Sequence, residues 1–159
     1  RIRPSPAFPN IEIECFYNNY PVFTDTNNLS LVAFVHYDGM GIIFPGDLEK
    51  AGWEALLLRQ SFRDHLERVN IFVASHHGRD SGYCEEVFNY CTPDIVIISD
   101  KEIVHETQKN NYAKHAIGVL FNSGPDKRYV LTTRSDGMIT ITKLVGEGYH
   151  IMVQPSNSG

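Results

Sequence analysis

Metal-binding side chains follow two strand-like runs of apolar residues in this chain. The first run, residues 41–44, leads to Asp47, and the second, residues 69–73, leads to the adjacent histidines His76 and His77. A carboxylate and imidazoles at neighbouring strand ends can form a divalent metal site. The sequence therefore predicts a metal site at the ends of two strands.

Each of these residues also has an interpretation without a metal. Asp47 precedes a predicted helix and would serve well as its N-cap. The histidine pair could belong to a merely hydrophilic loop. Two adjacent side chains must point in different directions, however, and they suit core packing poorly. We therefore expect one imidazole to ligate while the other orients it, or both to face a cleft.

Further polar residues fall where the same site would lie. His105 lies in a loop after the apolar run 95–99, so a third strand end would carry a metal-binding side chain, unless His105 is a solvated surface residue. Ligands of open α/β sheets collect outside the carboxyl ends of the strands. Three residues before a predicted hairpin either line the site or form an Asx turn: Asn27, Asn28 and Ser30. The remaining histidines are expected to be structural: His36, His65, His115 and His150.

Predicted strands and helices alternate in an order that can position these residues. Residues 11–16 alternate apolar and polar side chains, which predicts a strand with one solvated face. The turn Asp38-Gly39 predicts a hairpin between residues 29–37 and 41–44. Helical patterns cover residues 48–66, 81–90 and 112–121, and further strands cover 69–73, 95–99, 129–133 and 138–142, the last two separated by a turn at 135–137. This order predicts an α/β fold with a mixed sheet flanked by helices.

Composition narrows the class of protein. A chain of 159 residues with 42% hydrophobic and 21% charged residues forms one globular domain or a large piece of one. The formal net charge of -5 gives no electrostatic footprint for nucleic acid. The three cysteines lack CxxC spacing, which favours a reduced, cytoplasmic setting. No apolar run predicts a membrane segment.

The ordered combination of motifs resembles the second half of a metallo-β-lactamase-fold hydrolase. Within that family it is nearest to the hydrolase domain of ComEC-type competence proteins and their stand-alone relatives. The similarity runs over most of residues 27–142. The motifs that carry it are Asn27-Asn28-Leu29-Ser30-Leu31-Val32, Ile42-Ile43-Phe44-Pro45-Gly46-Asp47-Leu48-Glu49, Val73-Ala74-Ser75-His76-His77-Gly78-Arg79-Asp80-Ser81, Pro93-Asp94-Ile95-Val96-Ile97-Ile98-Ser99 and Asp136-Gly137-Met138-Ile139-Thr140-Ile141.

The resemblance implies an αβ/βα sandwich with two metal ions, zinc or manganese, that activate a bridging hydroxide. Asp47 matches the acid that bridges the two metals, and His77 matches a ligand from the late histidine motif. The resemblance implies that His76 lies beside the metals or faces the substrate. His105 matches a histidine that protonates the leaving group.

One part of the family pattern is absent. Such enzymes carry an HxHxDH motif in their first half, and this sequence has none. We therefore expect that an N-terminal half has been cut away, is carried by a separate chain or has been lost. We also expect the isolated chain to bind metal poorly. The absence of methionine at Arg1 points the same way. The expected division is an extended lead-in and edge strand over 1–26, the C-terminal half of the domain over 11–153, and a flexible tail over 154–159.

Two functions follow from the resemblance. The first is metal-dependent hydrolysis of phosphodiester bonds, with nucleic acid as a possible substrate, although opening of a β-lactam or lactone ring is not distinguished from it. The second is a degenerate module that binds a protein partner as a scaffold. An HxHxDH motif upstream of Arg1 would favour the enzyme, and its absence would favour the scaffold.

Overall fold

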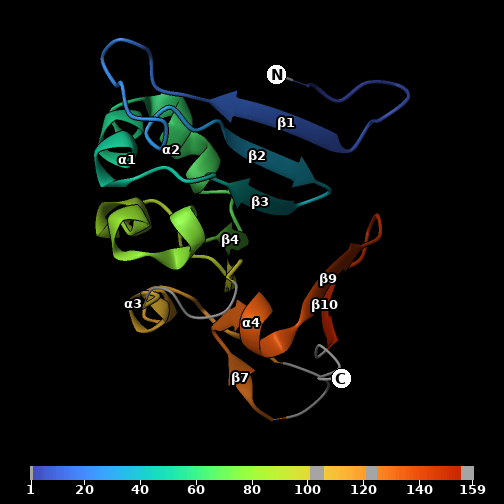
Figure 1. The fold of residues 1–159 in the computed structure, drawn as a ribbon. Helices are drawn as coiled ribbons and strands as arrows, with labels where there is room; N and C mark the ends of the chain where they lie inside the picture. Colours follow the sequence, from blue (N-terminus) through green and yellow to red (C-terminus); the bar gives the residue numbers. More distant parts are fainter. Residues whose placement is uncertain (1, 101–105, 121–124, 155–159) are drawn as a thin grey trace.

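A mixed six-stranded sheet forms the centre of the molecule. The computed structural model describes residues 2–100, 106–120 and 125–154 (Figure 1). The strands lie in the order β1-β2-β3-β4-β5-β8; β1, β2 and β3 pair antiparallel, and β3, β4, β5 and β8 pair parallel. Their bounds are β1 (Ile11–Phe16), β2 (Val32–Tyr37), β3 (Met40–Phe44), β4 (Ile71–Val73), β5 (Ile95–Ile98) and β8 (Val130–Thr132). The predicted α/β class with a mixed sheet flanked by helices is confirmed.

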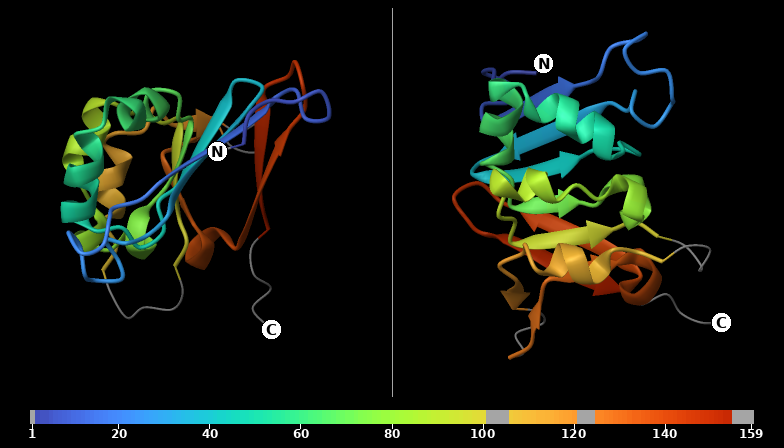
Figure 2. Two further views of the ribbon diagram at one scale, coloured as in Figure 1. Left: turned by 90° about the horizontal axis from the view of Figure 1, so that it is seen from above. Right: turned by 90° about the vertical axis from the view of Figure 1, so that its left-hand side faces the viewer.

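The two faces of this sheet are covered differently, as Figure 2 shows. One face packs against helices and 3-10 turns: α1 (Lys50–Leu57), α2 (Gln60–Leu66), η1 (Ser75–Gly78), η2 (Asp80–Gly82), η3 (Glu85–Asn89) and α3 (Lys109–Ala113). The other face packs against the antiparallel hairpin of β9 (Met138–Lys143) and β10 (Tyr149–Gln154). The remaining elements are β6 (Val119–Leu120), β7 (Lys127–Arg128) and α4 (Thr133–Asp136). Within the described ranges, no helix has the length and apolar character needed to cross a membrane.

Burial explains why the central strands have their sequences. All four residues of β5 are buried, as expected for a parallel strand covered on both faces. Trp53 and Phe72 belong to the core on the helical side, whereas Ile71 and Ile95 pack toward the hairpin. The turn between β2 and β3 has positive φ angles at Asp38 (46°) and Gly39 (84°), as a type I′ turn requires. The predicted hairpin is confirmed.

The prediction of one helix over residues 48–66 was wrong. The structure has α1 and α2, separated at Leu58 and Arg59, and Arg59 is extended with φ -90° and ψ 119°. Leu58, at the break, is 82% exposed. The break allows both short helices to turn apolar side chains, such as Leu56 and Phe62, into the same core.

Two further helix predictions need correction. Residues 81–90 contain the 3-10 turn η3 rather than a continuous helix. The helix predicted over 112–121 is displaced to Lys109–Ala113, and residues 119–120 form β6. The chain leaves the helical path because Gly118 has φ +88° and because the amides of Ile117 and Gly118 donate to the carbonyls of Pro93 and Asp94.

The end of the chain also differs from the prediction. The residues predicted as the turn at 135–137 lie mostly in α4, and β9 pairs with β10, a strand that the sequence did not predict. Asp136 stabilises this connection because its carboxylate accepts hydrogen bonds from the Thr132 amide (2.8 Å) and from Arg128 (2.7 Å). The predicted tail, 154–159, begins with Gln154 as the last residue of β10, and residues 155–159 lie outside the described residues.

Candidate functional site

The site lies where β3 and β4 end side by side. Asp47 follows β3, and His77 follows β4, its parallel neighbour. Asp47 Oδ1 and His77 Nε2 are 3.9 Å apart, with the side chains 50% and 53% exposed. The structure therefore brings together the two residues that the sequence predicted as metal ligands, at a solvent-accessible edge.

Hydrogen bonds tie the two turns to each other. The Gly46 carbonyl accepts from the His76 amide at 3.0 Å and lies 3.2 Å from Ser75 Oγ. Ser30 Oγ accepts from the Asp47 amide at 3.2 Å. Gly46 has φ +63°, and a Cβ at this position would lie 3.2 Å from the Ser30 side chain. These contacts fix the backbone of Asp47 relative to η1.

The backbone of η1 is strained at both histidines. His76 and His77 have φ angles of 47° and 57°, and Gly78 has φ 73°. A non-glycine residue in this left-handed region costs about 1 to 2 kcal/mol. Such conformations persist where the surroundings impose them, and they cluster at functional sites.

The hydrogen bond of His77 to the chain after β5 sets the role of its ring. His77 Nδ1 lies 2.7 Å from the Ser99 carbonyl, which can only accept. Nδ1 therefore carries a proton, and Nε2 is the nitrogen that faces Asp47 Oδ1. Metal-ligating histidines are oriented in this way, by a carbonyl that accepts from the second nitrogen. A cation could bind between Nε2 and the Asp47 carboxylate, and a proton on Nε2 would pair with the same carboxylate.

His76 lies in a separate network next to this pair. Its Nδ1 is 3.1 Å from Ser81 Oγ and 3.3 Å from Glu49 Oε1, and its Nε2 is 3.2 Å from Arg79. Asn27 donates to the same Glu49 oxygen at 3.0 Å. Both nitrogens of His76 thus have neighbours that orient the ring, and its catalytic role stays a prediction.

Asn28 and Ser30 have contacts that explain their positions before β2. Asn28 is buried, and its Oδ1 accepts from the amides of Glu49 (3.2 Å) and Gly52 (2.8 Å) at the start of α1. Asp25 accepts from the Asn28 amide at 2.7 Å. Asn28 therefore stabilises the helix that follows Asp47, while Ser30 contacts Asp47 directly. The N-cap position of α1 is Glu49, so the interpretation of Asp47 as an N-cap was wrong.

The other predicted candidates are placed as follows. His105 lies outside the described residues. The cysteines are free, and burial raises the pKa of both Cys84 and Cys91 to about 12, which keeps these thiols protonated. Both residues belong to the core on the helical side of the sheet, and a protonated thiol is a poor metal ligand.

Sequence reasoning missed four residues: Ser99 and Glu49 at this site, and Glu12 and Glu14 in a second cluster with His65. Ser99 acts through its backbone carbonyl, which has no signal in the residue type. Glu49 appeared only as an acidic residue at the start of a helix. Glu12 and Glu14 were assigned to a solvated face of β1, but this face also carries Phe16 and turns toward α2. The alternation of residue types predicted that the two glutamates share a face, but it did not predict that α2 packs on that face.

The donor set fits part of a metal site. Asp47 and His77 offer one carboxylate and one imidazole, and 3.9 Å is a separation that one cation can span. Among the described residues, no third His, Cys, Asp or Glu completes a cluster with them. Further ligands would have to come from outside these residues.

Comparison of the chain with protein-family models, curated proteins and solved structures gave no match.

Proposed function

We propose that this chain is the C-terminal half of a metallo-β-lactamase-like domain that hydrolyses phosphodiester bonds with two metal ions, zinc or manganese. One observation carries the proposal: Nε2 of His77, whose ring is oriented by the Ser99 carbonyl, lies 3.9 Å from Asp47 Oδ1. The strained turn that holds His77 supports the same interpretation.

The residues of this chain would have different roles at the site. Asp47 and His77 would hold metal, and Ser30, Ser75 and Gly46 would keep their turns in register. His76 would orient the Arg79 guanidinium through its contact with Nε2. When bound, the metal ions would lower the pKa of a water molecule and stabilise charge on the attacked phosphorus.

The missing ligands would come from an N-terminal half in the same protein or in a separate chain. A half-buried apolar face supports such a partner: Ile13 and Val35 pair across β1 and β2 on the side opposite Phe34, and neither belongs to the two buried clusters of the described residues. A partner half would cover this face.

Nucleic acid is the substrate that the resemblance favours, although the net charge of -5 adds no support. We keep a cytoplasmic setting as part of the proposal, because all three cysteines are free thiols.

The proposal is tested on protein expressed with all residues that its gene encodes before Arg1. We expect hydrolysis of bis(p-nitrophenyl) phosphate with Mn²⁺, loss on treatment with EDTA, and recovery when Mn²⁺ is returned. Asp47→Asn should lower kcat by at least about tenfold, because even residues that only support metal ligands have effects of this size. Asp64→Asn is the matched control, since Asp64 is an exposed carboxylate on α2. Full activity of a folded Asp47→Asn variant would refute the proposal.

The alternative is a degenerate scaffold, and the apolar face of β1 and β2 is the observation that favours it. In that case the complete protein binds a protein partner but shows no metal-dependent hydrolysis. An inactive wild-type protein that folds and lacks an upstream HxHxDH motif would decide for the scaffold.

A further inference from the structure

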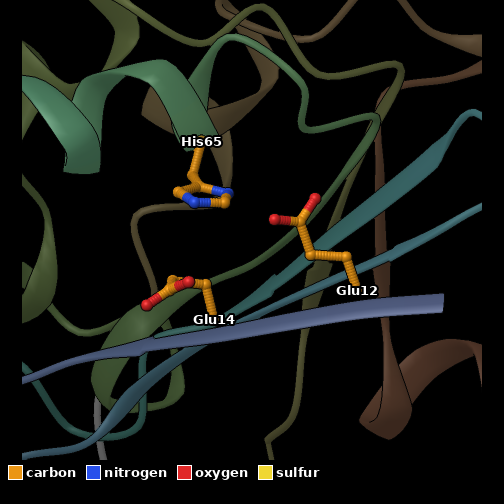
Figure 3. A group of neighbouring side chains, drawn as sticks. All are labelled: Glu12, Glu14 and His65. Carbon is orange, nitrogen blue, oxygen red and sulfur yellow. The ribbon is translucent and has the colours of Figure 1, made fainter. Parts of the chain in front are cut away.

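A second group of metal-binding side chains lies between β1 and α2. Glu12 and Glu14 on the strand and His65 near the end of the helix each offer a ligand atom, and these atoms all lie within 4.8 Å of one another. Figure 3 shows the three side chains pointing toward one another from the two elements. This arrangement joins an edge strand to a helix that is far away in sequence.

The core holds these side chains in place. Glu12, Glu14 and Phe16 share one face of β1, and the Phe16 ring packs edge-on against Phe62 of α2 at 5.1 Å and against His65 at 5.7 Å. His65 is 8% exposed, and the Glu12 side chain is 15% exposed. The carboxylates are therefore sheltered beside a buried imidazole rather than spread over the solvated face of a strand.

A second histidine orients the His65 ring. His36 Nε2 lies 3.0 Å from His65 Nδ1, and the two rings stack with centroids 5.2 Å apart. This contact engages Nδ1, so Nε2 of His65 is the nitrogen that would coordinate. An outer hydrogen bond of this kind fixes the ring of a metal-ligating histidine.

Two arginines compete with a cation for Glu12. Arg68 lies 3.1 Å from Oε2, and Arg3 lies 3.4 Å from Oε1. Both guanidinium groups are at least half exposed, and ion pairs of exposed arginines are weak enough to be displaced. A surface hollow of about 290 Å³ is lined in part by His36 and Arg68, the residues that contact His65 and Glu12.

We propose that Glu12, Glu14 and His65 bind one Zn²⁺ ion, which clamps the edge strand β1 to α2. Two carboxylates and one imidazole form a donor set that suits zinc, with a fourth position for water. The site is separate from the Asp47–His77 pair: Glu12 pairs with His36, and His36 pairs with Gly41 near the start of β3, whereas Asp47 follows its end. The proposal does not depend on the proposed hydrolase function.

The test measures Zn²⁺ binding by calorimetry together with the shift in melting temperature. Wild type should bind one Zn²⁺ at this site and melt several degrees higher with it. Glu14→Gln, which keeps the size of the side chain, should weaken this binding by at least about tenfold and remove the thermal shift. The matched control is Glu67→Gln, an exposed glutamate after the end of α2. Asp47→Asn should leave this site unchanged, which distinguishes it from the strand-end pair.

A gain of affinity provides an independent measurement. Arg68→Gln removes the guanidinium that contacts Glu12, so it should tighten Zn²⁺ binding, a result that a purely structural ion-pair cluster would not give. Circular dichroism without metal shows whether each variant folds, and Glu12→Gln replaces Glu14→Gln if the latter does not. The proposal is overturned if wild type does not bind Zn²⁺, or if its Zn²⁺ affinity does not depend on Glu12 and Glu14. It is also overturned if a folded Glu14→Gln variant binds Zn²⁺ as tightly as wild type.

Discussion

His77 shows how a backbone group can decide the chemistry of a side chain. The Ser99 carbonyl accepts a hydrogen bond from Nδ1, which leaves Nε2 as the nitrogen that faces Asp47. His76, the adjacent residue, has the same type and the same φ region, but its ring nitrogens contact Glu49, Ser81 and Arg79. The different surroundings of two identical neighbours therefore favour His77 as the ligand.

His36 gives a prediction for the pH dependence of stability. Burial, followed by the charges of Arg68 and His65, lowers its pKa from 6.5 to about 4, against an opposing effect of Glu12. Between these two pH values the unfolded chain binds a proton at His36 that the folded chain does not. The contribution of His36 to stability is therefore fully present above pH 6.5 and decreases as the pH falls toward 4. The free energy of unfolding should decrease by on the order of 2 kcal/mol over this window.

Urea unfolding in the presence of EDTA, at several pH values, measures this loss. His36→Gln should remove most of the decrease that is specific to this site, whereas His150→Gln, at an exposed position of β10, should leave it unchanged. Equal pH profiles of wild type and His36→Gln would show that other groups control the acid sensitivity.

At the level of elements, β3 depends on the absence of a side chain at Gly41. A Cβ there would lie 2.0 Å from the Arg68 carbonyl oxygen and 2.9 Å from His36 Nδ1. The Gly41 amide and carbonyl also bond with Asn70, both at 2.9 Å, so the strand cannot move away easily. Gly41→Ala should destabilise the protein by about 3 kcal/mol.

The midpoint of urea unfolding tests this expectation. Gly148→Ala is the control, because a Cβ at Gly148 would meet no atom within 4 Å, and its effect should stay within about 0.5 kcal/mol. If the two variants were equally stable, the close approach of β3 to Arg68 would have no energetic importance.

The elements that sequence predicted best are those specified by local chemistry. The Asp38-Gly39 turn needs positive φ at two positions, and the sequence supplies residues that tolerate it. The parallel strands appeared as apolar runs because both of their faces are buried. The break at Leu58 lets α1 and α2 pack into one core, and the displacement of α3 depends on hydrogen bonds to Pro93 and Asp94. No local pattern encodes either of these long-range contacts.

The same distinction applies to the candidate site. Residue types and strand ends were enough to predict that Asp47 and His77 would meet. The Ser99 carbonyl, the orienting network of His76 and the convergence of Glu12 and Glu14 on His65 depend on which elements become neighbours in space. Pairing of β1 with β2 and packing of α2 above them are long-range events, so the second cluster had no sequence signature.

For the whole molecule, the hairpin of β9 and β10 acts as a second layer that protects the parallel strands. Tyr149, Ile151 and Val153 point toward the sheet, and the residues between them point outward. Ile151 packs in the cluster that contains Ile71 and Ile95, whereas Met152 is 56% exposed. The contribution of this layer to stability should therefore alternate along β10 with a period of two.

This alternation can be measured with one pair of variants. Ile151→Ala should lower the free energy of unfolding by about 2 kcal/mol, because it removes partly buried methylene groups and leaves a gap against the sheet. Met152→Ala should change it by no more than about 0.5 kcal/mol. Single coincident transitions by fluorescence and circular dichroism would show that the hairpin unfolds together with the sheet. Equal effects of the two variants, or a separate early transition, would show instead that the hairpin contributes little to the cooperative core.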